Sequence, residues 1–266
     1  TRKKAEVFTP AWLCNLMNND CDKEWFGRKD VFNAENDDHT WTVVEEPIEF
    51  PKRKTWRHYV DSRRLEITCG IGQLDRKLRI ANENAADYDE WVKWVIRAFE
   101  ASYGYEYQGD NLLIARINLL LTFIDYYKER WDKEPDEKLL RTVTNKIVWN
   151  IWQMDGLKDT VPLGKPYEEF RQMTLFNMYS AMADMADNEP EAIPCKIYDW
   201  RRDNSILFNK LKEMKAMGHK LFDFVIGNPP YNEDFENSGD NGNFAKPVYN
   251  QFMDAAYEVA DKVELI

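Results

Sequence analysis

The sequence predicts an α/β fold in which a mostly parallel sheet carries helices on both faces. Two observations favour this fold class. Short runs rich in β-branched and aromatic residues alternate with longer stretches whose apolar residues recur at helical spacing. In addition, the 266 residues have a hydrophobic content of 44%, which is enough for one substantial core. Strands that alternate with helices of this length imply crossover connections, and crossovers join parallel strands.

The first sixty residues are predicted to form a segment distinct from the main domain, which we place at residues 61–266. Residues 11–18 predict a short helix, because Thr9 is a good capping residue and Pro10 suits the first helical position. Residues 20–60 are polar, charged and irregular, with one strand-like patch at 41–44. We interpret residues 20–60 as a peripheral arm.

From residue 61 onward the predicted elements alternate. The predicted strands are 65–68, 103–107, 147–154, 196–198, 222–227 and 262–266. The predicted helices are 88–102, 109–127, 136–145, 168–187, 205–217 and 246–260. The methionine stripe of residues 168–187 indicates core packing. In a parallel sheet of this type, ligands bind beyond the carboxyl ends of the strands, so the residues that follow each strand are the candidates for function.

The composition restricts the function classes. A net charge of −11 argues against this chain being the surface that grips a nucleic acid, because phosphate binding needs clustered Lys and Arg. Four scattered cysteines and three histidines give no zinc set and no disulfide framework, which favours a reducing, cytoplasmic environment. No apolar run approaches the roughly 20 residues that a membrane span needs.

The strongest local signal follows the predicted strand at 222–227, where residues 222–231 read FDFVIGNPPY. Pro229 and Pro230 have fixed φ angles and no N–H donors, so they make a stiff loop whose carbonyls can accept hydrogen bonds. Asn228 adds a side-chain acceptor, and Tyr231 adds a flat ring. This set suits a substrate with a planar amine. Asn-Pro and Pro-Pro pairs also occur in turns that only end a strand. The buried strand before them favours the functional interpretation.

These residues resemble the Asn/Asp-Pro-Pro-Tyr/Phe motif of amino-group methyltransferases, and in particular the gamma-class N6-adenine DNA methyltransferases of bacterial restriction–modification systems. The resemblance implies a Rossmann-like fold that binds S-adenosylmethionine. It also implies that Asn228 and the Pro229 carbonyl accept hydrogen bonds from an adenine amine. Pro230 stiffens the loop, and Tyr231 stacks on a base flipped out of the duplex. Catalysis by such a site comes mainly from positioning.

A second match lies near the N-terminus, where residues 4–10 read KAEVFTP. This run resembles the N-terminal motif of the same class, which touches the methionine part of the cofactor. The resemblance places Phe8, Thr9 and Pro10 at the cofactor.

Residues 65–72, which read LEITCGIG, resemble the cofactor loop of the family, typically Asp-Pro-Ala-Cys-Gly-x-Gly. The resemblance assigns Glu66, Thr68, Cys69, Gly70 and Gly72 to the cofactor, with glycines where the backbone must approach the ligand closely. Ile67 and Thr68 replace the usual Pro-Ala. The next residues, QLDRKLRIANEN, are more charged than the expected start of a helix. One hypothesis is that residues are missing between Gly70 and Ile71.

Three acidic residues follow other predicted strands. Glu106 ends the strand at 103–107, a position that commonly binds the ribose hydroxyls of a nucleoside cofactor, and the helical run ARINL at 115–119 is typical of the family. A solvated surface carboxylate is the alternative. Asp155 and Asp199 both compete for the adenine of the cofactor. We favour Asp155, because its strand directly follows the Glu106 unit.

The resemblance extends from residue 7 to residue 266. It implies double-stranded DNA as the partner, bound through a target-recognition region that we expect outside these residues together with the last strands of the sheet. A restriction endonuclease, separate or fused, is a further implied partner. Two alternatives stay open, namely a protein-glutamine or RNA methyltransferase and a non-catalytic cofactor-binding subunit. The Phe-Thr-Pro motif argues against the first, and the intact Asn228 and Tyr231 argue against the second.

Overall fold

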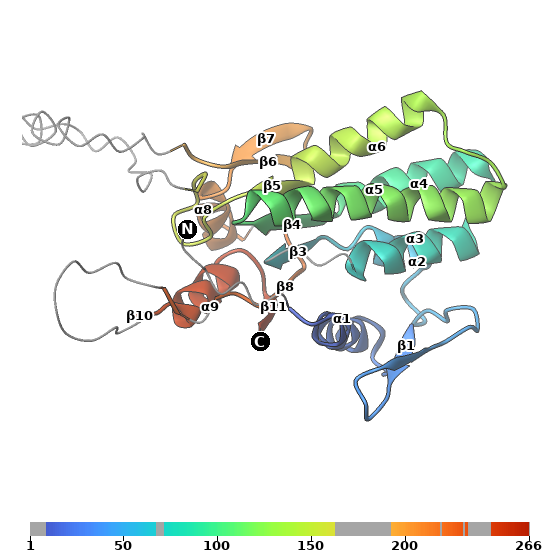
Figure 1. The fold of residues 1–266 in the computed structure, drawn as a ribbon, viewed down its shortest axis with the longest axis horizontal. Coiled ribbons are helices and arrows are strands. Elements are labelled where there is room, and N and C mark those ends of the chain that lie inside the picture. The colour runs from blue at the N-terminus through green and yellow to red at the C-terminus, as the bar shows by residue number, and fades with distance from the viewer. Residues whose placement is uncertain are drawn as a thin grey trace, which may run out of the picture.

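The computed structural model describes residues 9–67, 72–162, 193–218, 220–230, 232–233 and 246–265 (Figure 1). The helices are α1 (Ala11–Phe26), α2 (Trp56–Val60), α3 (Gly72–Asn84), α4 (Tyr88–Glu100), α5 (Gly109–Trp131), α6 (Glu137–Asn150), α8 (Lys210–Ala216) and α9 (Tyr249–Tyr257). The strands are β1 (Asn33–Glu35), β2 (Trp41–Val43), β3 (Arg64–Ile67), β4 (Ser102–Glu106), β5 (Ile151–Gln153), β6 (Lys196–Asp199), β7 (Asn204–Leu207), β8 (Phe224–Gly227), β9 (Asn232–Glu233), β10 (Lys246–Pro247) and β11 (Lys262–Leu265).

The central sheet has five parallel strands in the order β11-β8-β3-β4-β5. The chain begins the sheet at β3 and adds β4 and then β5 on one side. It then returns to the other side of β3 for β8 and β11. The direction of winding therefore reverses between β3 and β8, which is where open α/β sheets bind their ligands. The fold class predicted from the sequence, a Rossmann-like α/β fold with a parallel sheet, is confirmed.

Side chains alternate between the two faces of the sheet, and those of each face pack into a separate hydrophobic core. Leu65 and Ile67 of β3 join one cluster with residues of the β6–β7 hairpin, α8 and α9. Phe224 and Ile226 of β8 point to the other face and join a larger cluster formed mainly by α1 to α6. In Figure 1 helices α3 to α6 lie together on one side of the sheet. Both central strands, β3 and β8, are buried along their whole length.

The α1–α6 face also buries a network of charges around Asp22 of α1. Its carboxylate accepts hydrogen bonds from Tyr59 at 2.6 Å and from Arg64 at 3.1 Å, and it pairs with Arg76 of α3. Close by, the Lys77 ammonium is fully buried and donates to the carbonyls of Ser62 (2.7 Å) and Ala101 (2.9 Å). Burial lowers the pKa of Lys77 well below its ordinary value.

This network explains how residues 72–84 form a helix despite their charge. The run QLDRKLRIANEN is too charged for a typical buried helix, yet it forms α3. Arg76 points inward and pairs with Asp22, 54 residues away in the sequence. Lys77 also points inward and donates to the carbonyl of Ser62, 15 residues away. Buried charges are tolerated when they are paired and hydrogen-bonded.

The N-terminal region also departs from its prediction. Helix α1 continues to Phe26 rather than ending near residue 18, and α2 is helical. Trp25, Phe32 and Tyr59 are buried in the core of the α1–α6 face, so much of residues 20–60 is core rather than a peripheral arm. Large aromatic side chains supply burial even where the sequence between them is charged. The strand predicted at 41–44 is present as β2.

Two further elements begin later than predicted. Residues 147–150 belong to the end of α6, and β5 starts at Ile151, because Val143 and Ile147 continue the helical spacing of buried residues. Residues 204–207 form β7, which pairs with β6 as an antiparallel hairpin, so only the second half of the helix predicted at 205–217 exists. The helix predicted at 168–187 lies outside the described residues. Among the described helices, none has the length and apolar content that a membrane span requires.

Candidate functional site

The carboxyl ends of β3 and β8 meet at the point where the winding of the sheet reverses. The parallel register places Gly227 opposite Ile67. A Cβ atom at Gly227 would lie 2.4 Å from the Ile67 carbonyl oxygen and 2.7 Å from the Ile67 Cβ. No side chain fits in that space, so glycine is required for the two strands to approach this closely. The residues after Gly227 therefore leave the sheet directly beside the end of β3.

The Asn228-Pro229-Pro230 segment begins at that point and has no regular secondary structure. Pro229 is buried and Pro230 is exposed, and neither has an N–H to donate. The Asn228 side chain is partly buried, and its Nδ2 donates to the Thr9 hydroxyl at 3.3 Å. Because the amide nitrogen is bound to Thr9, the orientation of the Asn228 amide, including its acceptor oxygen, is set by the N-terminal segment.

The contact between Thr9 and Asn228 joins residues that are 219 positions apart. Helix α1 begins after Pro10, whose carbonyl accepts the N–H groups of Leu13 (3.0 Å) and Cys14 (3.2 Å). Pro10 is thus the N-cap residue, and no side chain caps the helix. The predicted capping role of Thr9 is wrong, because its hydroxyl accepts from Asn228 instead.

A small cavity lies beneath this contact, between α1 and the ends of β3 and β8. It is lined by Thr9, Cys14, Met17, Asn18, Glu66, Ile67, Ile226, Gly227 and Asn228. Glu66 is 8% exposed, and burial raises the pKa of its carboxyl to about 8, although Arg64 and Arg76 act in the opposite direction. A buried carboxyl of this kind is largely protonated at neutral pH.

Asn18 connects the same cavity to the start of α3. Its Nδ2 donates to the Cys14 carbonyl at 2.8 Å, and its Oδ1 is buried and accepts no hydrogen bond from any described residue. A Cβ atom at Gly72, the first residue of α3, would lie 2.9 Å from the Asn18 Nδ2. Gly72 therefore packs directly against α1. The N-terminal end of α3, which carries partial positive charge, begins at the reversal point of the sheet.

Two acidic residues follow the neighbouring strands at the same edge. Glu106 ends β4, and its Oε1 accepts the backbone N–H groups of Tyr107 (2.9 Å) and Gln108 (3.1 Å) just before α5. Asp155 follows β5, and its Oδ1 accepts the Leu157 N–H at 3.1 Å. The Met154 N–H donates to the Glu106 carbonyl at 3.0 Å, so the two strand ends are adjacent. The carboxyl edge of one sheet thus brings together six candidate residues, namely Thr9, Glu66, Gly72, Glu106, Asp155 and Asn228.

This arrangement agrees with the comparison against known protein families. Residues 100–266 match the family described as Eco57I restriction-modification methylase, and this match covers more than half of the chain. The chain belongs to that family. No curated protein and no solved structure matched it. The family identifies the chain as a methyltransferase of restriction–modification, and the sheet described above positions its candidate site.

Asp199 of the methylase lies apart from the other candidates. It ends β6, which runs antiparallel to β7 outside the central sheet. Its Oδ1 accepts the Arg201 N–H at 3.0 Å, and the Arg201 guanidinium pairs with Asp61 at 2.8 Å. Asp61 precedes β3, so Asp199 belongs to the amino edge of the sheet. Of the two competing aspartates, only Asp155 lies at the same edge as Asn228.

Several predicted site residues of the methylase lie outside the described residues. They are Phe8, Thr68, Cys69, Gly70 and Tyr231. The hypothesis of missing residues between Gly70 and Ile71 concerns the same undescribed stretch.

Two residues that shape the site of the methylase are not among the candidates predicted from the sequence. The sequence places Asn18 at the end of a short predicted helix, and its position beside Gly72 depends on a contact between α1 and α3. Gly227 was read as the end of a strand. Its position directly before Asn-Pro-Pro was a usable signal, since a glycine inside a strand pattern often marks a close approach of two backbones.

Proposed function

We propose that this methylase transfers a methyl group from S-adenosylmethionine to the N6 amine of an adenine in DNA. One observation carries the proposal. The Asn228-Pro229-Pro230 segment leaves β8 at the reversal point of the sheet, and Asn228 is held there by Thr9. An amide oxygen and a backbone carbonyl that precedes a proline are acceptors, and together they suit the two N–H groups of a planar amine.

The chain's own residues would act by holding the amine in one orientation. The Asn228 Oδ1 and the Pro229 carbonyl would each accept one N–H, which directs the lone pair of the nitrogen out of the plane of the base. Thr9 would act as a positioning residue, because its hydroxyl takes the Asn228 Nδ2 and so presents the oxygen to the substrate. Pro229 and Pro230 limit the motion of the loop. Preorganised acceptors of this kind avoid reorganisation during the reaction.

The residues around the reversal point fit S-adenosylmethionine. Asn18 Oδ1 is a buried acceptor that no described residue satisfies, and the cofactor's ammonium group is a donor. Gly72 begins α3 where a side chain would collide with Asn18. Glu106 and Asp155 end adjacent strands, as carboxylates that bind the ribose and the adenine of a nucleoside would. When bound, the cofactor supplies an electrophilic methyl group on a sulfonium.

The proposal extends to Tyr231 and to DNA. Tyr231 would stack on the adenine after the base leaves the duplex, since enzymes that modify a base must extrude it. The net charge of −11 means that the phosphate-binding surface would lie in a target-recognition region outside this chain. A restriction endonuclease, separate or fused, would be the functional partner.

Calorimetric titration with S-adenosylmethionine tests the cofactor assignment. We expect saturable binding to the wild-type protein and at least tenfold weaker binding to Glu106→Ala. The matched control is Glu137→Ala, since Glu137 lies in the first turn of α6 with 77% of its side chain exposed. Equal binding by both variants would contradict the assignment of Glu106 to the cofactor site. The absence of binding to folded wild-type protein would contradict S-adenosylmethionine as the cofactor.

A further inference from the structure

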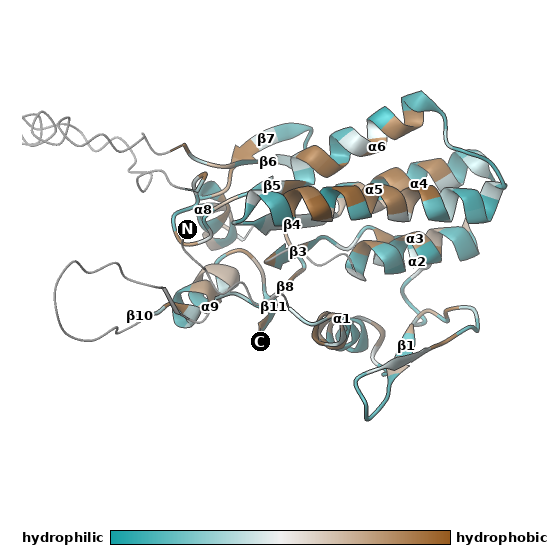
Figure 2. Cartoon of the chain, in the orientation of Figure 1, coloured by the Kyte–Doolittle hydropathy of each residue, from teal (hydrophilic) through white to brown (hydrophobic). Residues whose placement is uncertain are grey.

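The outer face of α5 is unusually apolar for a solvated helix. Four aliphatic side chains stand in a row on it and are about half exposed, namely Leu113 (58%), Ile114 (54%), Ile117 (48%) and Leu121 (51%). Figure 2 shows hydrophobic segments along much of this helix. Val148 of α6, also 48% exposed, extends the row, because Arg116 of α5 donates to the Val148 carbonyl at 3.2 Å. We call these five residues the α5 stripe.

The ends of the α5 stripe are acidic. Asp110 is exposed at the start of α5, and Asp125 and Glu129 are exposed beyond Leu121. The cations nearby already have partners: Lys128 is paired with Glu134 at 2.7 Å, and Arg116 and Arg130 donate to backbone carbonyls. From Asp110 to Glu129 the helix rises about 28 Å. An apolar centre with acidic ends is therefore presented along one helix.

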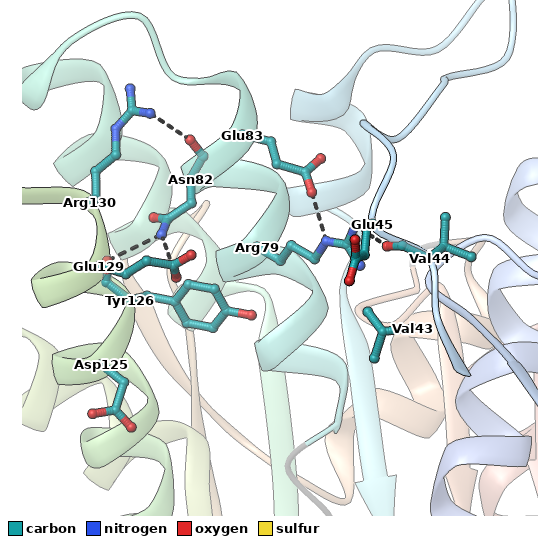
Figure 3. A pocket seen from close by; sticks show the side chains of 10 residues that line it. All are labelled: Val43, Val44, Glu45, Arg79, Asn82, Glu83, Asp125, Tyr126, Glu129 and Arg130. Atoms are coloured by element: carbon teal, nitrogen blue, oxygen red, sulfur yellow. Dashed lines mark hydrogen bonds and ion pairs between the residues drawn. The ribbon is translucent and has the colours of Figure 1, made fainter. Parts of the chain in front are cut away.

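At its second end the α5 stripe runs into an open cleft of about 830 Å³ (Figure 3). The cleft is bounded by β2, α3 and α5, and it is lined by Val43, Val44, Glu45, Arg79, Asn82, Glu83, Asp125, Tyr126, Glu129 and Arg130. Val43 is 55% exposed, so the cleft also has an apolar wall. It lies at the far end of α3 and α5 from the Asn228 segment.

The two arginines of the cleft are engaged by the protein itself. Arg79 bonds to Glu83 at 2.7 Å and to the Val44 carbonyl at 2.6 Å. Arg130 donates to the carbonyls of Asn82 (2.9 Å) and Ala85 (2.8 Å). Glu45, Asp125 and Glu129 form no ion pair with any described residue. Glu129 accepts a hydrogen bond from the Asn82 Nδ2 at 3.4 Å, so the three carboxylates keep a negative charge that an occupant of positive charge would balance.

A second copy of this chain does not suit the surface. If two α5 helices packed antiparallel around Ile117, Asp110 of one would face Asp125 of the other. If they packed in parallel, Asp125 would face Asp125. Like charges oppose one another in both cases, which disfavours association. A row one helix wide is also narrow for a stable dimer, which buries about 800 Å² per partner. The width and the charges instead suit a single amphipathic helix.

We propose that the α5 stripe and the adjoining cleft dock an amphipathic helix of a partner protein, with aliphatic side chains along one face and Lys or Arg at its ends. The aliphatic face would cover Leu113, Ile117 and Leu121. The basic ends would lie against Asp110 and against the carboxylates of the cleft. The cleft at the second end of this surface lies at the far end of α3 and α5 from the Asn228 segment, whereas Asp110 at its first end follows Glu106 by four residues.

The test uses two fluorescent synthetic peptides of 18 residues, each with leucines at helical spacing, one with lysines at both ends and one with glutamates there. We expect saturable binding of the lysine peptide by fluorescence anisotropy and at least tenfold weaker binding of the glutamate peptide. Ile117→Asn and the double variant Asp125→Lys/Glu129→Lys should each weaken the lysine peptide at least tenfold. Met217→Asn is the control, since Met217 is 68% exposed at the end of α8.

Three results would overturn the proposal. The first is equal binding of the two peptides, and the second is unchanged binding by Ile117→Asn that folds normally by circular dichroism. The third is a wild-type dimer in sedimentation that Ile117→Asn converts to a monomer, because the surface would then join two copies of this chain. Methylation activity is not the readout, so the result is independent of the function proposed above.

Discussion

Arg64 and Glu66 lie two residues apart on the same face of β3, and both are buried, but the protein treats their charges in opposite ways. Arg64 bonds to Asp22 and keeps its charge within a network that joins α1, α2 and α3. Glu66 lines the cavity below Asn228, and burial raises its pKa to about 8. The amino half of the strand thus serves stability, whereas the carboxyl half keeps polar groups available for a ligand.

The largest effect is expected from a substitution that breaks the buried charge network around Arg64, at the amino half of β3. Asp22→Asn removes the only carboxylate that balances Arg64 and Arg76 within the described part of this network. We expect a loss of about 3–5 kcal/mol in the free energy of unfolding, because a buried charge is left without its partner. Urea denaturation measures the loss. Asp37→Asn, in the exposed turn between β1 and β2, is the control. A change below about 1 kcal/mol in Asp22→Asn would show that the network is not a stabilising unit.

The second change removes a side chain of the candidate site at the carboxyl edge of the sheet. We expect Asn228→Ala to lower kcat about 100- to 1,000-fold, as the loss of one preorganised hydrogen-bonding group does elsewhere. The free energy of unfolding should change little, because the Asn228 side chain is only partly buried. Asn228→Asp keeps an acceptor oxygen and should retain more activity than Asn228→Ala. The rates are measured at saturating S-adenosylmethionine and DNA, and equal rates for the two variants would contradict the acceptor role.

The third change concerns the Glu66 carboxyl in the carboxyl half of β3. Between about pH 4.5 and pH 8 the Glu66 carboxyl is protonated in the folded protein but ionised in the unfolded chain. The folded state then binds more protons, so stability falls as the pH rises through this window, by up to about 1.4 kcal/mol per pH unit. Glu66→Gln lacks this slope, and its stability relative to the wild type should grow until about pH 8. Parallel stability curves in urea denaturation would contradict a neutral buried Glu66.

The smallest effect is expected from a substitution that tests whether Thr9 positions Asn228. Thr9→Val keeps the size of the side chain but removes the hydroxyl that accepts from Asn228. We expect kcat to fall about tenfold, in line with one hydrogen bond of about 1.4 kcal/mol. Thr9→Ser should restore most of the rate. If Thr9→Val changed only the KM for S-adenosylmethionine, Thr9 would act on the cofactor alone and would not position Asn228.

The candidate site at the carboxyl edge of the sheet could be predicted from the sequence better than the buried Asp22 network. Asn-Pro-Pro after a buried strand is a local signal, and so is an acidic residue at the end of the strand before α5. Both are read from a few neighbouring residues. The Asp22 network could not be predicted in this way, because its members are 37 to 54 residues apart and look like surface charges when taken singly.

Other features needed the order of the strands. Asp155 and Asp199 both follow strand-like runs, and only the topology separates them, since β5 belongs to the central sheet whereas β6 pairs with β7. The same holds for Thr9 and Asn228, which meet because α1 packs beside β8. The start of β5 was misplaced because Val143 and Ile147 suit either a helix or a strand in a short window.

The most direct test of the central claim is a product analysis by mass spectrometry. Double-stranded DNA of mixed sequence is incubated with the protein joined to the target-recognition region proposed above and with S-adenosylmethionine that carries a deuterated methyl group, and the DNA is then digested to nucleosides. The account predicts deuterated N6-methyldeoxyadenosine from the wild type and a strong loss of it from Asn228→Ala. Deuterium in methylated cytosine, or an undiminished adenine product from Asn228→Ala, would contradict the account.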